Sequence, residues 1–120
     1  MHQAADWGAT RVTHTYNAQT PFTHRAPGVP GAALTDDRLF AEFIGDGVHL
    51  HDDAVKVLLR CKGACKAVAI TDSMEAAGLP DGEYALGGQA VTVRGHEARL
   101  HDGTLAGSVL LMRQAFQNLM

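Results

Sequence analysis

Two short polar stretches contain residue types that could do chemistry. In Thr13–Ala18, His14 follows a β-branched run, and in Ile70–Ser73, Asp72 follows a second apolar run. An imidazole can bind a divalent metal, and a carboxylate beside a metal-bound water can accept and pass on a proton. A histidine and an aspartate at the ends of two separate strands therefore indicate a metal-assisted hydrolase site. One histidine cannot hold a catalytic metal alone, because such sites usually have three protein ligands.

Each of these residues also has a purely structural interpretation. His14 could be a strand-end histidine that hydrogen-bonds to the backbone. Asp72 could cap the turn after its strand, since Asp-Ser is a common turn pair. Cys61 and Cys65 lack the CxxC spacing of redox motifs, and no second pair completes a zinc ribbon. We expect these two cysteines to be reduced and structural.

Composition sets further bounds on the function. With 120 residues the chain is long enough for one compact domain, but it is too short for a complete barrel enzyme of about 250 residues. A net charge of −3 provides no basic surface for nucleic acid. No apolar run approaches the ~20 residues needed to cross a bilayer, and the N-terminus has no signal core. We therefore predict a cytoplasmic protein without nucleic-acid or membrane partners.

The first third of the chain contains the first of these stretches. Residues 1–8 indicate the end of a helix that Gly8 closes, and residues 9–14 alternate as a strand does. Residues 15–33 contain three prolines and predict a long loop. Loops of this length are usually functional.

A strand–helix–strand unit is predicted over residues 38–71. An apolar run at 38–45 indicates a strand, and Asp52 is the expected N-cap of a helix from 53 to about 62 that ends at Gly63. Residues 66–71 indicate a short strand of the buried parallel type. The three elements together form a βαβ unit.

The last third has a different pattern. Gly82–Leu86, Gln89–Arg94 and Glu97–Leu100 are short strands separated by glycine-containing turns, which indicates a small antiparallel meander. Ser108 is the expected cap of a final helix over 109–119. The order of elements is typical of part of a barrel made from strand–helix units. His14, His49 and Asp72 all follow strands, which is where barrel enzymes have their active sites.

Five motifs resemble the N-acetylglucosamine-6-phosphate deacetylases, a family of the amidohydrolase superfamily. The match runs in unbroken order over nearly all of this chain but covers only the later part of the family's chain. The motifs are Gly8-Ala9-Thr10 with Thr13-His14 and Asn17-Ala18, His24-Arg25-x-Pro27-Gly28 with Gly31-Ala32, Asp46-Gly47-Val48-His49, Thr71-Asp72, and Gly78–Gly82 with Asp102-Gly103-x-Leu105–Ser108.

The resemblance implies an α/β fold, namely a partial (β/α)8 TIM barrel that contains the last strand–helix units. It implies that residues 82–101 are a β-hairpin insertion. The family's upstream half-barrel and β-sandwich portion are absent from these residues. We therefore expect residues 1–120 to be the C-terminal part of a larger barrel domain.

The implied activity of the parent enzyme is hydrolysis of the acetamide of N-acetylglucosamine 6-phosphate to glucosamine 6-phosphate and acetate. His14 resembles a ligand of a divalent metal such as zinc or iron. Asp72 resembles the catalytic aspartate, first a general base and then a general acid. The other matched positions resemble substrate-binding residues: Asn17, Ala18, Arg25, His49, Leu105, Ala106 and Gly107.

These substrate-binding positions divide by the part of the ligand they would contact. The Asn17-Ala18 loop, Arg25 and His49 resemble groups that hold the phosphosugar, and Leu105–Gly107 resembles a loop that closes over the acetyl group. Arg25 could instead be a solvated loop residue, and Ala26 stands where the family usually has a glutamate. Leu105–Gly107 could instead form only a tight turn before a helix.

The remaining histidines are assigned minor roles. His49-Leu50-His51 also resembles the HxH metal pair found elsewhere in the superfamily, so a second metal site is conceivable, although His51 is expected to start the following loop. The other three histidines are expected to be exposed: His24, His96 and His101.

Three alternatives remain open for the chain as a whole. We predict that the isolated chain is inactive, labile or oligomeric, and that the parent enzyme is a homodimer. The chain could be a non-catalytic phosphosugar-binding fragment, or a fragment that completes a barrel with a partner. It could also derive from an amidohydrolase for another N-acyl sugar.

Overall fold

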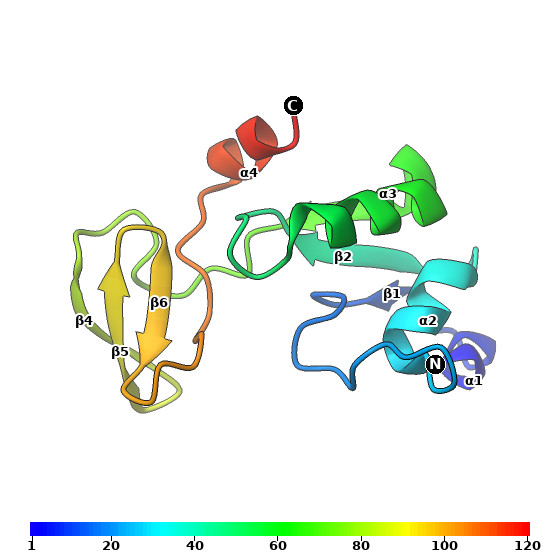
Figure 1. Ribbon diagram of the computed structural model, residues 1–120, viewed down its shortest axis with the longest axis horizontal. Helices are drawn as coiled ribbons and strands as arrows, with labels where there is room; N and C mark the ends of the chain where they lie inside the picture. Colours follow the sequence, from blue (N-terminus) through cyan, green and yellow to red (C-terminus); the bar gives the residue numbers. More distant parts are fainter. The chain divides into compact units, whose positions relative to one another are not determined.

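The computed structural model describes all 120 residues, which form two compact units. Unit 1 comprises Met1–Phe43 and Leu50–Ile70, and unit 2 comprises Ile44–His49 and Thr71–Met120. The chain is mixed α/β, as predicted (Figure 1). Each unit has its own buried apolar clusters. The chain is long enough for one compact domain, but its buried residues are divided between the two units.

Unit 1 contains a three-stranded sheet of β1 (Arg11–Val12), β2 (Phe40–Ile44) and β3 (Ala67–Ile70), in the order β1-β2-β3. β1 and β2 are parallel, with Arg11 opposite Phe40 and Val12 opposite Ala41. The strand predicted over 9–14 is only two residues long. β3 is half-buried rather than buried, because it lies at an edge of the sheet and has one neighbouring strand.

The helix α2 (Gly28–Thr35) was not predicted, because its glycines and prolines indicate a loop. The first backbone hydrogen bond of this helix runs from Gly31 N to Pro27 O over 2.9 Å. Pro30 therefore lies in the first turn, where an N–H would have no partner inside the helix. The Ala33 and Leu34 side chains of α2 are buried in the core of unit 1.

The helix α3 (Asp52–Lys66) provides the crossover between β2 and β3, and the short helix α1 (His2–Asp6) precedes β1. Asp52 is not the N-cap of α3, contrary to the prediction. His51 is, and its side chain accepts a hydrogen bond from Asp53 N. The break at Gly63 is confirmed, because this residue has φ 63° and ψ 177°. The free and exposed cysteines lie on either side of it, at Cys61 and Cys65.

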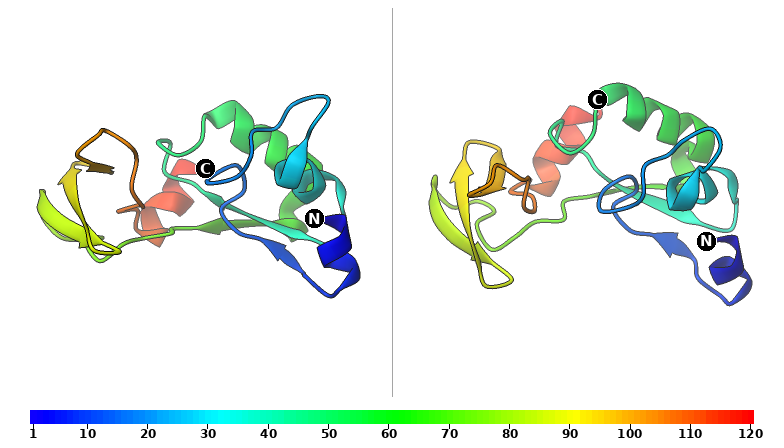
Figure 2. Two further views of the ribbon diagram at one scale, coloured as in Figure 1. Left: turned by 90° about the horizontal axis from the view of Figure 1, so that it is seen from below. Right: turned by 60° about the horizontal axis from the view of Figure 1, so that its bottom comes forward.

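Unit 2 is built around the antiparallel meander β4 (Gly82–Leu86), β5 (Gln89–Arg94) and β6 (Glu97–Leu100), shown in Figure 2. The bounds of these three strands are those predicted from the sequence. Their buried side chains pack against residues from the flanking segments. The cluster consists of Met74, Ala76, Val91, Val93, Ala98, Ala106 and Val109.

The last helix, α4 (Met112–Asn118), is shorter than predicted, and its N-cap is Leu111 rather than Ser108. Ser108 is buried, and its Oγ accepts a hydrogen bond from Leu110 N at 2.9 Å. The Ser108 hydroxyl therefore accepts a hydrogen bond in the segment before α4 and does not cap the helix.

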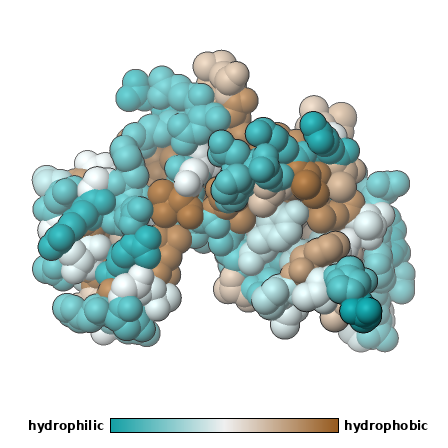
Figure 3. Space-filling view, in the orientation of Figure 1, coloured by the Kyte–Doolittle hydropathy of each residue, from teal (hydrophilic) through white to brown (hydrophobic).

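The face of the molecule shown in Figure 3 has both hydrophilic and apolar areas. On α4, Met112 and Phe116 are more than half exposed. None of the four helices combines the length and apolar character required to cross a bilayer.

Candidate functional site

The predicted site residues lie in both units, and each group is described within its own unit. Unit 1 contains His14, Asn17, Ala18 and Arg25. Unit 2 contains His49, Asp72, Leu105, Ala106 and Gly107.

The loop after β1 has an unusual backbone. His14, Tyr16 and Ala18 have φ values of 27°, 79° and 50°. Side chains on Cβ disfavour this left-handed region, and such residues cluster at functional sites. Only one other non-glycine residue has a positive φ, Asp72 at 49°. All four strained residues therefore lie in the two stretches that the sequence marks as chemical.

Hydrogen bonds hold this strained loop in place. Thr15 N donates to Glu42 O of β2 at 2.7 Å, and Asn17 N donates to His14 O at 2.8 Å. The Gln19 side chain closes the loop, since it accepts from Tyr16 N and donates to Thr13 O, both at 3.1 Å. The loop conformation is thus fixed by groups within unit 1.

The Nδ1 atom of His14 is buried and has no hydrogen-bond partner in the chain. This is evidence against the alternative in which Nδ1 hydrogen-bonds to the backbone. A buried, unpartnered imidazole nitrogen fits the role of one metal ligand. No three His, Cys, Asp or Glu side chains are grouped in the chain. The chain therefore offers one candidate ligand and not a complete ligand set.

Arg25 is exposed in the loop before α2. Its Nη1 atom lies 2.7 Å from Nε2 of His24, so the histidine accepts the hydrogen bond. The Arg25 side chain forms no ion pair with a carboxylate, and the next residue is Ala26. The guanidinium is thus oriented by an exposed neighbour and remains free to bind an anion.

In unit 2 the structure brings Asp72 beside the segment that follows β6. The Asp72 carbonyl accepts from Ser108 N at 3.3 Å, and Met74 N donates to Ser108 O at 2.9 Å. Ser73 Oγ donates to Leu110 O at 2.6 Å. The Asp72 residue itself is exposed. The Thr71-Asp72 motif and the motif that ends at Ser108, which are far apart in the sequence, are therefore joined by hydrogen bonds.

Leu105–Gly107 is held against the meander. Ala106 is buried, and its N–H donates to Ala98 O at 2.8 Å. Gly107 has φ 75°, and a Cβ there would lie 3.3 Å from Leu86 Cδ2. The segment is more than a tight turn, because it adds a backbone connection to β6.

His49 is paired with a carboxylate that the sequence reasoning did not single out. Its Nδ1 lies 2.6 Å from Oδ2 of Asp46, and both side chains are less than a tenth exposed. Burial raises the Asp46 pKa. Hydrogen bonds from the His49 ring and from the backbone of His49 and Val48 lower this pKa by more than burial raises it, so the net shift is downward. His51 instead caps α3 and is exposed. The Nδ1 atoms of both histidines are thus engaged in hydrogen bonds within the chain.

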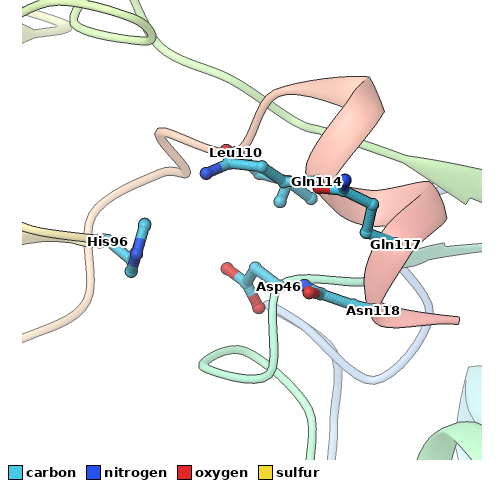
Figure 4. Close-up of a pocket in the computed structure, with 6 residues that line it drawn as sticks. All are labelled: Asp46, His96, Leu110, Gln114, Gln117 and Asn118. Carbon is cyan, nitrogen blue, oxygen red and sulfur yellow. The ribbon is translucent and has the colours of Figure 1, made fainter.

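A cavity of about 240 Å³ lies within unit 2, and sequence reasoning did not predict it. Figure 4 shows the Asp46 carboxylate directed into it, with His96 on one side and side chains of α4 on the other. His96 is exposed, as are His24 and His101, so that prediction is confirmed. The cavity is lined by Asp46, His96, Leu110, Gln114, Gln117 and Asn118.

Comparison with known proteins identifies relatives of the whole chain. It is 51% identical over 99% of its length to the N-acetylglucosamine-6-phosphate deacetylase of Bacillus subtilis. The predicted resemblance is confirmed. The chain is also 42% identical over 98% of its length to the N-acetylgalactosamine-6-phosphate deacetylase of Escherichia coli O157:H7. It spans only 30% and 33% of the lengths of these two deacetylases. No protein-family model matches the chain.

Solved structures of these deacetylases have the same fold over this region. The N-acetylglucosamine-6-phosphate deacetylase from Thermotoga maritima is 44% identical and matches 98% of this chain with a TM-score of 0.91, which is 32% of that chain. An aspartate-to-alanine variant from Mycobacterium smegmatis, in complex with N-acetyl-D-glucosamine-6-phosphate, is 39% identical with a TM-score of 0.89. It matches 96% of this chain and 30% of its own. The relatives that cover this chain are thus hydrolases of one kind.

Proposed function

We propose that this chain is the C-terminal part of an enzyme that hydrolyses the acetamide of N-acetylglucosamine 6-phosphate. The observation that carries the proposal is 51% identity to a deacetylase of that name over 99% of this chain. The parallel pair β1–β2 and the β2–α3–β3 order support a partial (β/α)8 barrel with the meander as an insertion. The homodimeric parent and the cytoplasmic location remain predictions.

In the proposed reaction Asp72 is the proton carrier. Its carboxylate takes a proton from the water whose oxygen bonds to the acetamide carbon, and then delivers that proton to the amine as the carbon–nitrogen bond breaks. The products are acetate and glucosamine 6-phosphate. A divalent metal, when bound, supplies carbonyl polarisation and a more acidic water. The buried free Nδ1 of His14 supports this residue as a ligand from this chain.

The phosphosugar would be bound by groups already described. Arg25 is exposed without a carboxylate partner, and its guanidinium fork matches the geometry of a phosphate. Backbone N–H groups of the Asn17-Ala18 loop and the ring of His49 complete the polar contacts. Leu105–Gly107 would contact the acetyl methyl group through apolar atoms and backbone.

The test combines the chain with the missing part. The purified 120-residue chain with added divalent metal is expected to be inactive on the acetylated phosphosugar. Fusing it behind the upstream portion of the Bacillus subtilis relative should produce an active deacetylase. In that fusion Asp72→Asn should lower the rate by about 10²–10⁴-fold. An exposed aspartate outside the site, Asp37, provides the matched control: Asp37→Asn should leave the rate unchanged.

A second substrate is favoured by a specific observation, the 42% identity to an N-acetylgalactosamine-6-phosphate deacetylase. The two sugars differ only at one hydroxyl centre. Parallel assays with both epimers decide between them, and faster turnover of the galactosamine compound would reject the assignment above. If the fusion bound glucosamine 6-phosphate but hydrolysed neither acetylated phosphosugar, the non-catalytic alternative would be favoured.

A further inference from the structure

The turn after β2 is organised by one carboxylate. Oδ1 of Asp46 accepts hydrogen bonds from Val48 N at 2.9 Å and His49 N at 2.8 Å. Oδ2 accepts from the His49 ring at 2.6 Å. Gly47 has φ 74°, which lets the chain turn tightly enough for all three bonds. Asp46 thus fixes both the backbone and the side chain of His49.

The chemistry of this contact determines which ring nitrogen carries hydrogen. Asp46 is only 4% exposed in its side chain, yet its pKa is lowered by the hydrogen bonds it accepts, so its oxygens are acceptors at neutral pH. Nδ1 of His49 must therefore be the donor. The Nε2 atom of His49 makes no hydrogen bond within the chain. It is also not one of the buried polar atoms that lack a partner, so it is accessible to solvent. Nε2 is the nitrogen left for a ligand.

Other groups hold this turn in position. Asn118 of α4 donates to Gly45 O at 2.9 Å, directly before Asp46. The other titratable group lining the cavity beside Asp46 is His96, which is exposed (Figure 4). His49 provides the one side chain that pairs with Asp46, whose other hydrogen bonds come from backbone N–H groups of the same turn.

We propose that Asp46 is a positioning residue that fixes His49 with Nδ1–H on the carboxylate and presents Nε2 to an oxygen of the phosphosugar. This inference rests on the proposed function for the identity of the ligand. The positioning itself is independent of it. Asp46 contacts no reacting atom, and it acts only through the ring of His49.

The first test needs no variant and no substrate. Long-range nitrogen–proton NMR of the 120-residue chain, labelled at histidine, reports which nitrogen of His49 carries hydrogen. The expected result at neutral pH is hydrogen on Nδ1. A neutral ring with hydrogen only on Nε2 would overturn the proposal.

The second test separates positioning from general damage. In Asp46→Asn the amide can turn its NH2 group toward the ring, so hydrogen should move to Nε2. In the active fusion, binding of glucosamine 6-phosphate should weaken about 10–100-fold, the usual effect of losing such a supporting contact. His49→Ala combined with Asp46→Asn should bind no worse than His49→Ala alone, because the aspartate acts through the histidine. Additive losses would contradict this.

A matched control is available in the same unit. Asp102 also accepts a backbone N–H two residues later, from Thr104 at 2.9 Å, but it has no histidine partner. Asp102→Asn should change neither the His49 ring signals nor ligand binding. If the wild-type fusion failed to bind the phosphosugar while Nδ1–H persisted, the proposed function would be wrong and the positioning correct. Unweakened binding in Asp46→Asn would reject the positioning.

Discussion

The strained backbone at Asp72 leads to a test with glycine and alanine substitutions. Glycine should give the more stable protein at Asp72, and alanine should give the more stable protein at Asp37. Asp72 has φ 49°, whereas Asp37, an exposed aspartate in a turn, is not among the residues with positive φ. Neither side chain forms a hydrogen bond within its own unit, and glycine and alanine at Asp37 remove its attraction to Lys62 equally. We compare glycine and alanine at both positions.

The magnitude follows from two opposing effects. Alanine in the left-handed region costs about 1–2 kcal/mol, because its Cβ approaches the following carbonyl. Glycine instead loses about 0.5–1 kcal/mol more backbone entropy on folding than alanine. At Asp72 the net preference should favour glycine by about 0.7 kcal/mol. At Asp37 only the entropy difference operates, so alanine should be favoured by about the same amount.

Urea denaturation of the four variants measures this directly, because all share one chain and differ by one methyl group at each site. We expect Asp72→Gly to unfold at higher urea than Asp72→Ala, and Asp37→Gly at lower urea than Asp37→Ala. The same ranking at both sites would refute the reasoning that the Asp72 backbone is strained. A confirmed reversal would mean that the proposed catalytic carboxylate is held at the expense of stability.

Three further perturbations test the fold. Leu58 is fully buried and Leu59 is 37% exposed, so Leu58→Ala should cost about 2–5 kcal/mol in urea melts and Leu59→Ala much less. His51→Ala should cost about 0.5–2 kcal/mol by removing the acceptor that caps α3, which helix circular dichroism at rising temperature would detect. Burial lowers the pKa of Lys62, so the unfolded chain binds more protons between the folded pKa and 10.5, and stability should rise with pH in that window. Lys62→Met should abolish this rise in denaturation measured at several alkaline pH values, and an unchanged slope would assign it to another group.

The strands of the meander could be predicted because their signals are local. Each run alternates, and the two-residue turns between them, Gly87-Gly88 and Gly95-His96, fix the register of the strands. The helix α2 could not be predicted from the same rules. A proline breaks a helix in its interior but is acceptable in its first turn, and the sequence does not show which position Pro30 occupies. Only the surrounding core, which buries Ala33 and Leu34, decides which case applies.

The candidate site was partly accessible from the sequence. The resemblance indicated His14 and Asp72, and the strand pattern placed both after strands. The positive φ values were not predictable, because neither residue is a glycine. The partner of His49 was also missed, although Asp46 stands three positions earlier in the quoted motif. A carboxylate followed by Gly47 and a histidine is a signal that could have predicted a self-contained turn.

The two sheets differ in how far apart along the chain their paired residues are. In the meander Leu86 pairs with Gln89, whereas the parallel pair joins Arg11 to Phe40. Closing the longer loop costs about 1–2 kcal/mol more chain entropy, so the meander should form early and the parallel strands late. During synthesis β1 and β2 leave the ribosome before the meander, yet the meander is the sheet that can assemble from neighbouring residues. β1 therefore waits without its neighbour until β2 has been made, and an unpaired strand edge in that interval can pair with another chain.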